Sequence, residues 1–154
     1  DPTYDEIIYA IDAFDFTGYE EFVFCGYGEP TCALEMLEKT AKYVKDKYHL
    51  PIRVNTNGLG NLYHGRDIVP ELAEYVDSVS ISLNAANAEE YNNVTRPSFD
   101  NAYEAMLDFA EECNRMIKHT QLSIVDVLPE EDIKTCQQIA DERGIHLKIR
   151  HFSN

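Results

Sequence analysis

The sequence has few basic residues and no long apolar run. Its 154 residues include 13 Lys and Arg against 28 Asp and Glu, which gives a formal net charge of -15. That excess repels phosphate backbones, so it argues against extended nucleic-acid binding and favours a small-molecule partner. No run approaches the roughly 20 apolar residues of a membrane span, and no basic-then-apolar order marks a signal peptide. We therefore expect a soluble, cytoplasmic protein that does not bind membranes.

Cysteine is scarce as well. Cys25, Cys32, Cys113 and Cys136 are too few and too scattered for the disulfide framework of a small secreted domain. Cys25 and Cys32 are separated by six residues, and the other two fall on apolar faces of expected helices. No pair has the spacing of metal ligands, so we predict no metal site from these residues and expect all four to be packed in the interior.

Five short apolar segments alternate with amphipathic ones at a βαβ-like period of about 30 residues. The length fits one domain, which would span residues 1–154. This alternation predicts an α/β fold with a parallel sheet, either doubly wound or curled toward a barrel, with ligand sites at the carboxyl ends of the strands. The expected strands are residues 22–25, 52–56, 79–83, 122–127 and 147–152.

One face of this expected sheet is polar. In the third strand Val79, Ile81 and Leu83 share the apolar face, so the residues between them point the other way. The same alternation recurs in two other strands, which predicts that hydrogen-bonding groups and cations surround one wet cavity rather than a packed barrel core. The residues on that polar face are Arg53, Asn55, Asn57, Ser80, Ser82, Asn84, Lys148 and Arg150.

Three segments at strand ends resemble a known family. The turn within Phe24 to Thr31 (FCGYGEPT) is similar to the glycine-glutamate-proline motif of radical S-adenosylmethionine (SAM) enzymes. Asn55 to Gly58 (NTNG) and Ser80 to Ala85 (SISLNA) resemble the motifs on the next two strands of that superfamily, in the expected order. Residues 57–67 (NGLGNLYHGRD) resemble a narrower radical SAM group that is associated with TatD-type nucleases.

The resemblance implies a partial (βα) barrel in which about five of six units are present. The family's first strand and its loop, which carries a CxxxCxxC motif, are missing from this sequence, so the chain is expected to be a core domain truncated at its N-terminus. In the family that motif binds a 4Fe-4S cluster, which reductively cleaves SAM to a 5'-deoxyadenosyl radical. We therefore expect a metal-binding oxidoreductase as the full-length parent, with an unknown substrate, and an inactive fragment here.

The family's cofactor contacts can be placed on this chain by position. The glycine-rich loop would hold the methionyl amino group of SAM, the polar residues of the next two strands would reach its ribose or carboxylate, and Arg150 would bind an anionic group. The residues expected to bind SAM are Gly26, Gly28, Glu29, Pro30, Asn55, Asn57, Ser82, Asn84 and Arg150.

Two other functions fit the same residues. Glu29 and Asp126 both lie near carboxyl ends of strands, where two carboxylates serve as acid and base in a barrel hydrolase. A metabolite-binding or assembly module without catalysis is the other reading, and a sheet edge left open would favour a homo-oligomer. Glu29 has a further structural role open to it, as a first-turn carboxylate that stabilises the helix N-terminus after Pro30.

Overall fold

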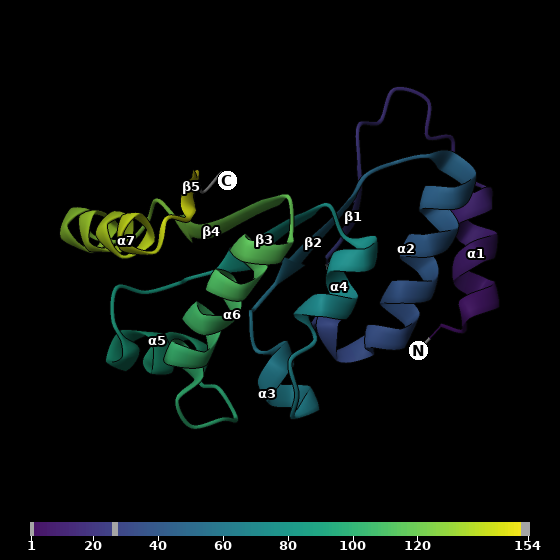
Figure 1. Ribbon diagram of the computed structural model, residues 1–154. Helices are drawn as coiled ribbons and strands as arrows, with labels where there is room; N and C mark the ends of the chain where they lie inside the picture. The colour runs from purple at the N-terminus through teal and green to yellow at the C-terminus, as the bar shows by residue number, and fades with distance from the viewer. Residues whose placement is uncertain (1, 26–27, 152–154) are drawn as a thin grey trace.

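Helices and strands alternate along the whole chain in the computed structural model, which describes residues 2–25 and 28–151 (Figure 1). The strands are β1 (Phe22–Phe24), β2 (Ile52–Thr56), β3 (Ser78–Ser82), β4 (His119–Val125) and β5 (His146–Arg150). The α-helices are α1 (Tyr4–Asp12), α2 (Leu34–Tyr48), α3 (Gly60–His64), α4 (Val69–Tyr75), α5 (Ala88–Thr95), α6 (Ala102–Met116) and α7 (Glu130–Arg143), and η1 (Pro30–Ala33) is a 3-10 turn.

The sequence pattern predicts these elements closely. The second strand has the expected bounds, whereas β4 begins three residues before the predicted start at residue 122 and ends two residues before the predicted end at residue 127. Phe152, the predicted end of the last strand, lies outside the described residues. The short helix α3 and the turn η1 were not predicted, because neither is long enough to show a helical period.

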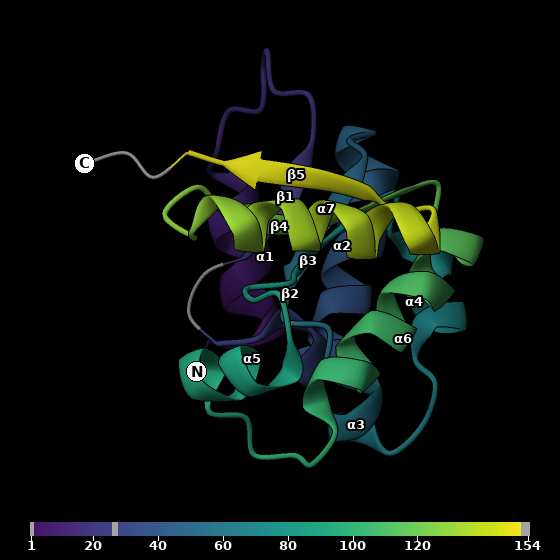
Figure 2. The same ribbon diagram turned by 90° about the vertical axis from the view of Figure 1, so that its left-hand side faces the viewer.

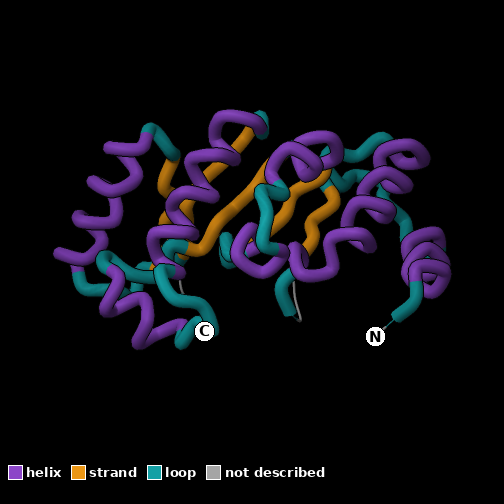
Figure 3. The backbone as a smooth tube through the Cα atoms, turned by 60° about the horizontal axis from the view of Figure 1, so that its bottom comes forward, coloured by secondary structure: helices purple, strands orange, loops and turns teal. Residues whose placement is uncertain are grey.

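The sheet is parallel throughout, with the strands in the order β1-β2-β3-β4-β5. Each strand therefore lies next to its successor, and right-handed crossovers between successive strands place every connecting helix on the same face of the sheet. A doubly wound sheet would reverse its order and carry helices on both faces. Figures 1 and 3 show the helices following the strands from α1 and α2 at one end to α7 at the other. The fold is a partial βα barrel.

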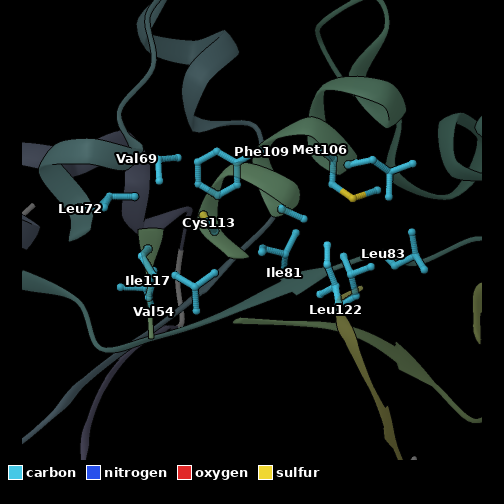
Figure 4. Close-up of a cluster of buried hydrophobic side chains, with 14 of the residues drawn as sticks. Val54, Val69, Leu72, Ile81, Leu83, Met106, Phe109, Cys113, Ile117 and Leu122 are labelled. Carbon is cyan, nitrogen blue, oxygen red and sulfur yellow. The ribbon is translucent and has the colours of Figure 1, made fainter. Parts of the chain in front are cut away.

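The apolar core lies between the sheet and this helical layer. Val54, Ile81 and Leu122 reach it from three neighbouring strands and are fully shielded from solvent. Met106 and Phe109 of α6 pack against them in Figure 4. Each such side chain contributes about 1.5–3 kcal/mol to the free energy of unfolding, so this interface supplies most of the energy that holds the strands in place.

The opposite side of the sheet, called the open face below, is polar. Its members follow from the cross-strand register, because partners in a parallel pair point to the same side. The predicted polar face of β2, β3 and β5 is thus confirmed, and β4 adds to it. The open face consists of Val23, Arg53, Asn55, Ser78, Ser80, Ser82, His119, Gln121, Ser123, Val125, His146, Lys148 and Arg150.

Candidate functional site

Glu29 organises the loop that follows β1. One carboxylate oxygen accepts hydrogen bonds from the Thr31 N–H at 3.0 Å, the Thr31 hydroxyl at 2.6 Å and the Thr56 hydroxyl at 2.6 Å, while the other accepts from the Asn57 N–H at 2.7 Å. Glu29 is also the residue that caps η1, with Pro30 as its first residue. Glu29 therefore has the structural role considered above, as a carboxylate at the N-terminus of the helical segment after Pro30. The carboxylate joins the carboxyl ends of β1 and β2 into one unit.

Gly58, in the turn after β2, packs directly on the core. It has a φ of 78°, and a Cβ there would come within 2.9 Å of both the Ile81 Cγ2 and the Met106 Cγ. Glycine is required on both counts. The preceding Asn57 side-chain oxygen accepts from the Leu59 N–H at 2.9 Å, which holds the turn. The Asn57 amide nitrogen has no hydrogen-bond partner among the described residues, so it is available to a ligand.

Asn84, just beyond β3, has an unusual backbone conformation. Its φ is 66°, and the Ala85 N–H donates back to the Leu83 carbonyl oxygen at 2.8 Å, which closes a tight turn around Asn84. Strained residues of this kind are retained where the surrounding structure forces them, and they cluster at binding sites. Among the described residues, no hydrogen bond engages the Asn84 side chain.

A cavity of about 270 Å³ brings Asn57 and Asn84 together at the carboxyl ends of β2 and β3. Three further residues that the sequence analysis did not select, Cys32, Tyr63 and Arg96, also line it. Arg96 ends α5 with a φ of 45°, so a second strained residue borders the same cavity. The sequence around Arg96 and Pro97 is typical of a helix end, and nothing in its spacing links it to Asn57, which lies about forty positions earlier.

The other predicted residues lie at varying distances from this cavity. The adjacent loop contains Gly28, Glu29 and Pro30, directly before Thr31. Gly28 has a φ of 74°, a backbone conformation that favours glycine at this position. Asn55 and Ser82 are half-buried on the open face of β2 and β3. Gly26 lies outside the described residues.

Arg150 is not brought to this cavity. It ends β5, where it pairs with Val125, two strands away from β3. The cavity that holds Asn57 and Asn84 is therefore not shared with β5 among the described residues. A hollow of about 850 Å³ does lie on the open face, but at the amino ends of the strands, where Arg53, His119 and His146 are among its lining residues.

His64 and Glu38 form a polar cluster beside this edge. The His64 Nε2 lies 2.7 Å from the Thr31 carbonyl oxygen. This contact links α3 to the η1 turn. Glu38 of α2 faces Glu71 of α4, and burial together with the negative charge of Glu71 raises the pKa of Glu38 to about 7. Arg66 pairs with Glu71 and lowers the pKa of that carboxylate. A protonated Glu38 can donate to Glu71, so the cluster shares one proton near neutral pH.

The cysteines correct one expectation. Cys113 and Cys136 are buried as predicted, and burial raises the pKa of both thiols, that of Cys136 to about 11. Cys25 is exposed and Cys32 is half-buried, so packing in the interior was wrong for Cys25. The strand ends at Phe24 rather than including Cys25, which leaves that thiol beyond the packed part of β1. In the part of the chain that is described, no three His, Cys, Asp or Glu side chains form a group able to hold a metal ion.

The hydrolase reading gains no support from the geometry. The Glu29 carboxylate is occupied by four hydrogen bonds between β1 and β2. Asp126 follows β4, and its carboxylate pairs with His151 at 2.9 Å. Two strands, β2 and β3, separate β1 from β4, so the two carboxylates do not flank one bond of a substrate.

The fold and this edge define a class of protein: a parallel βα barrel segment with a cavity at the carboxyl ends of its strands, where barrel proteins of this kind place their sites. A family model described as the radical SAM superfamily matches residues 1–142, and the chain belongs to that superfamily. None of the curated proteins searched matches it.

A solved structure supports the fold independently. It is a domain of a pyruvate-formate lyase-activating enzyme from Bacteroides vulgatus ATCC 8482, to which this chain is 16% identical with a TM-score of 0.52. The alignment covers 84% of this chain and 98% of that one. At this identity the similarity concerns the fold alone, and it agrees with the partial barrel predicted from the sequence. None of the helices in the described part of the chain is long and apolar enough to span a membrane.

Membership of this family implies SAM and a 4Fe-4S cluster, and the two groups fit the residues of this chain differently. Asn57 and Asn84 line the cavity, and among the described residues no hydrogen bond engages the Asn57 side-chain amide nitrogen or the Asn84 side chain, so both can meet polar groups of an amino acid or a ribose. A cluster needs several thiolates close together, whereas the two cysteines near this edge, Cys25 and Cys32, are the only pair in reach and no CxxxCxxC occurs in the sequence. The residues present fit SAM and do not fit the cluster.

Proposed function

We propose that this chain is the SAM-binding portion of a radical SAM enzyme. The observation that carries the proposal is the cavity that holds Asn57 and Asn84 beside the Glu29 loop, at the carboxyl ends of strands in a chain of this superfamily. Residues around Gly28, Asn57 and Asn84 would hold SAM, which would supply radical chemistry in an enzyme that also carried a 4Fe-4S cluster. A cytoplasmic location remains a prediction from the sequence.

Each group at the edge has a distinct part in the proposal. Glu29 holds the loop so that backbone groups near Gly28 meet the methionyl amine, and it does so by fixing Thr31 and Asn57 rather than by touching SAM. The amides of Asn57 and Asn84 donate to the ribose or the carboxylate from opposite sides of the cavity. Asn55 and Ser82 extend this polar surface along the open face.

The sequence contains no CxxxCxxC motif, and its cysteines do not fit a 4Fe-4S cluster. We therefore expect the chain to bind SAM weakly and not to cleave it when supplied with iron, sulfide and a reductant. Cleavage by this chain alone would contradict that part of the proposal, whereas binding of SAM tests the other part without any activity.

The decisive experiment is a titration of the ¹⁵N-labelled chain with SAM, followed through backbone amide shifts. We expect saturable shifts at Asn57, Tyr63 and Asn84. Asn84→Gly removes the side-chain amide and relieves the positive φ, so it should weaken SAM binding about tenfold without loss of stability. Asn101→Gly is the matched control, because Asn101 also has a positive φ, of 59°, but does not line the cavity. Equal effects of the two variants would overturn the assignment.

We further propose that the chain forms a homodimer through β1. This strand pairs only with β2, and Val23 is 37% exposed beside a groove of about 600 Å³ to which Ile7, Phe22 and Phe24 contribute. An unpaired strand edge next to apolar surface is a template for a second copy around a two-fold axis. Light scattering should give a dimer mass at high concentration, and Val23→Lys should give the monomer. A monomer at all concentrations would contradict the proposal.

A further inference from the structure

The open face of the sheet carries no negative charge on its strands. None of its strand residues is Asp or Glu, although the chain has 28 acidic residues. The cations on it are not spread evenly: β5 alone contributes His146, Lys148 and Arg150. Figure 2 shows β5 along the edge of the sheet with α7 beside it. In a chain of net charge -15, a cationic strand on one face marks a place that attracts anions.

Lys148 and Arg150 lack the ion-pair partners that most other Lys and Arg residues of the described chain have. Arg53, the remaining Arg on the open face, pairs with Glu21 at 2.9 Å. Neither Lys148 nor Arg150 takes part in any ion pair between described residues. Asp126, which follows β4, pairs with His151 at 2.9 Å.

A row of hydroxyls continues the cationic strand toward the SAM site. Ser82 is the register partner of Ser123, and Ser123 is the partner of Lys148, so the three side chains lie side by side on β3, β4 and β5. Ser123 is only 4% exposed as a residue, and no hydrogen bond engages its hydroxyl among the described residues. The hydroxyl oxygen is not one of the fully buried polar atoms without a partner, so it can be reached from the open face and can donate to a ligand there.

We propose that the row Ser82, Ser123 and Lys148, together with Arg150, binds an anionic group of the substrate, a phosphate or a carboxylate. The proposal rests on the proposed function, because it assigns SAM to the cavity at Asn57 and Asn84 and the substrate to the adjacent strands. It also reassigns Arg150 from the cofactor to the substrate.

The geometry suits an anion better than a neutral ligand. Neighbouring strands lie about 4.8 Å apart, so the hydroxyls of Ser82 and Ser123 can donate to two oxygens of one phosphate. The longer side chain of Lys148 can bring its ammonium to a third oxygen. Arg150 is two residues further along the same face, about 6.6 Å away, and its planar guanidinium adds a bidentate contact. Ser82 ends β3 two residues before Asn84, so the row of hydroxyls begins on the strand whose carboxyl end leads to the SAM cavity.

The test is a titration of the ¹⁵N-labelled chain with inorganic phosphate and, separately, with malonate, at constant ionic strength. We expect saturable shifts of the Ser82, Ser123 and Lys148 amides with at least one probe. Tighter binding of phosphate assigns a phosphorylated substrate, and tighter binding of malonate assigns a carboxylate. Lys148→Gln should raise the dissociation constant about tenfold, Ser123→Ala should raise it severalfold, and Lys148→Arg should restore binding.

Lys134→Gln is the matched control, since Lys134 is an exposed lysine on α7 outside the open face. Thermal unfolding of each variant shows whether the fold is kept. Shifts scattered over all lysines, an effect of Lys134→Gln equal to that of Lys148→Gln, or no saturable shift along the row would each overturn the proposal. The SAM titration on the same sample reports on Asn57 and Asn84, so failure of the anion site and failure of the SAM site are observed separately.

Discussion

Two carboxylates on either side of η1 meet opposite environments. Glu29, before η1, accepts four hydrogen bonds from groups of the β1 and β2 loops. Glu38, on α2 after it, is partly desolvated and faces Glu71, which raises its pKa to about 7. Donors surround the first, whereas a like charge opposes the second. The comparison shows that an ionised Glu29 stabilises the loops after β1 and β2. An ionised Glu38, in contrast, destabilises the packing of α2 against α4, because it repels Glu71.

The largest expected effect follows from removing the charge at Glu29. Glu29→Gln keeps the shape but offers an amide NH₂ to donors that need an acceptor, so we expect the free energy of unfolding to fall by about 2–4 kcal/mol in urea denaturation. SAM-induced shifts at Asn57 should weaken at the same time. Glu89→Gln is the control, because this exposed first-turn carboxylate of α5 makes none of these contacts and should cost under about 1 kcal/mol. A loss no larger than that of the control would show that the loop does not depend on Glu29.

A smaller effect, of opposite sign, is expected at Glu38. Its folded pKa lies above the ordinary value of 4.5, so the folded state binds the extra proton between pH 4.5 and about 7. Stability from this group is therefore present below pH 4.5 and is lost as the pH rises through about 7. Glu38→Gln should remove this dependence, which raises stability at pH 8 relative to the unchanged chain and leaves it almost unchanged at pH 4. Because Glu38 is partly exposed, we expect under about 1 kcal/mol.

Unfolding curves of both proteins at pH 4, 6 and 8 measure this difference. Glu35→Gln, one turn earlier on α2, is the control: Glu35 is exposed and pairs with Lys39, so no gain should develop as the pH rises. If the Glu38→Gln and Glu35→Gln proteins followed the same pH dependence, the interaction between Glu38 and Glu71 would not be the cause.

Much of the fold was predictable because its signals are local. Alternation along β2 and β3 identified the face that carries Asn55 and Ser82, and the local pair Asn87 and Glu90 forms the N-terminal cap of α5. The motifs after β1, β2 and β3 also predicted the family, which the match over residues 1–142 confirms. The contact of Thr56 with Glu29 could not be predicted, because it joins residues that are 27 positions apart in the sequence. The contact of Thr31 with Glu29 could not be predicted either, because the η1 turn is too short to show a sequence pattern.

The sequence by itself determined the order of strands and helices, the polar alternation and the superfamily, since periodicity, caps and motifs each act over a few residues. Only the tertiary structure decided that every helix lies on one face, that Arg96 borders the cavity of Asn57 and Asn84, that Arg150 is remote from it, and that Cys25 is exposed. The physical reason is that strand order and register, rather than spacing along the chain, set which side chains share a surface.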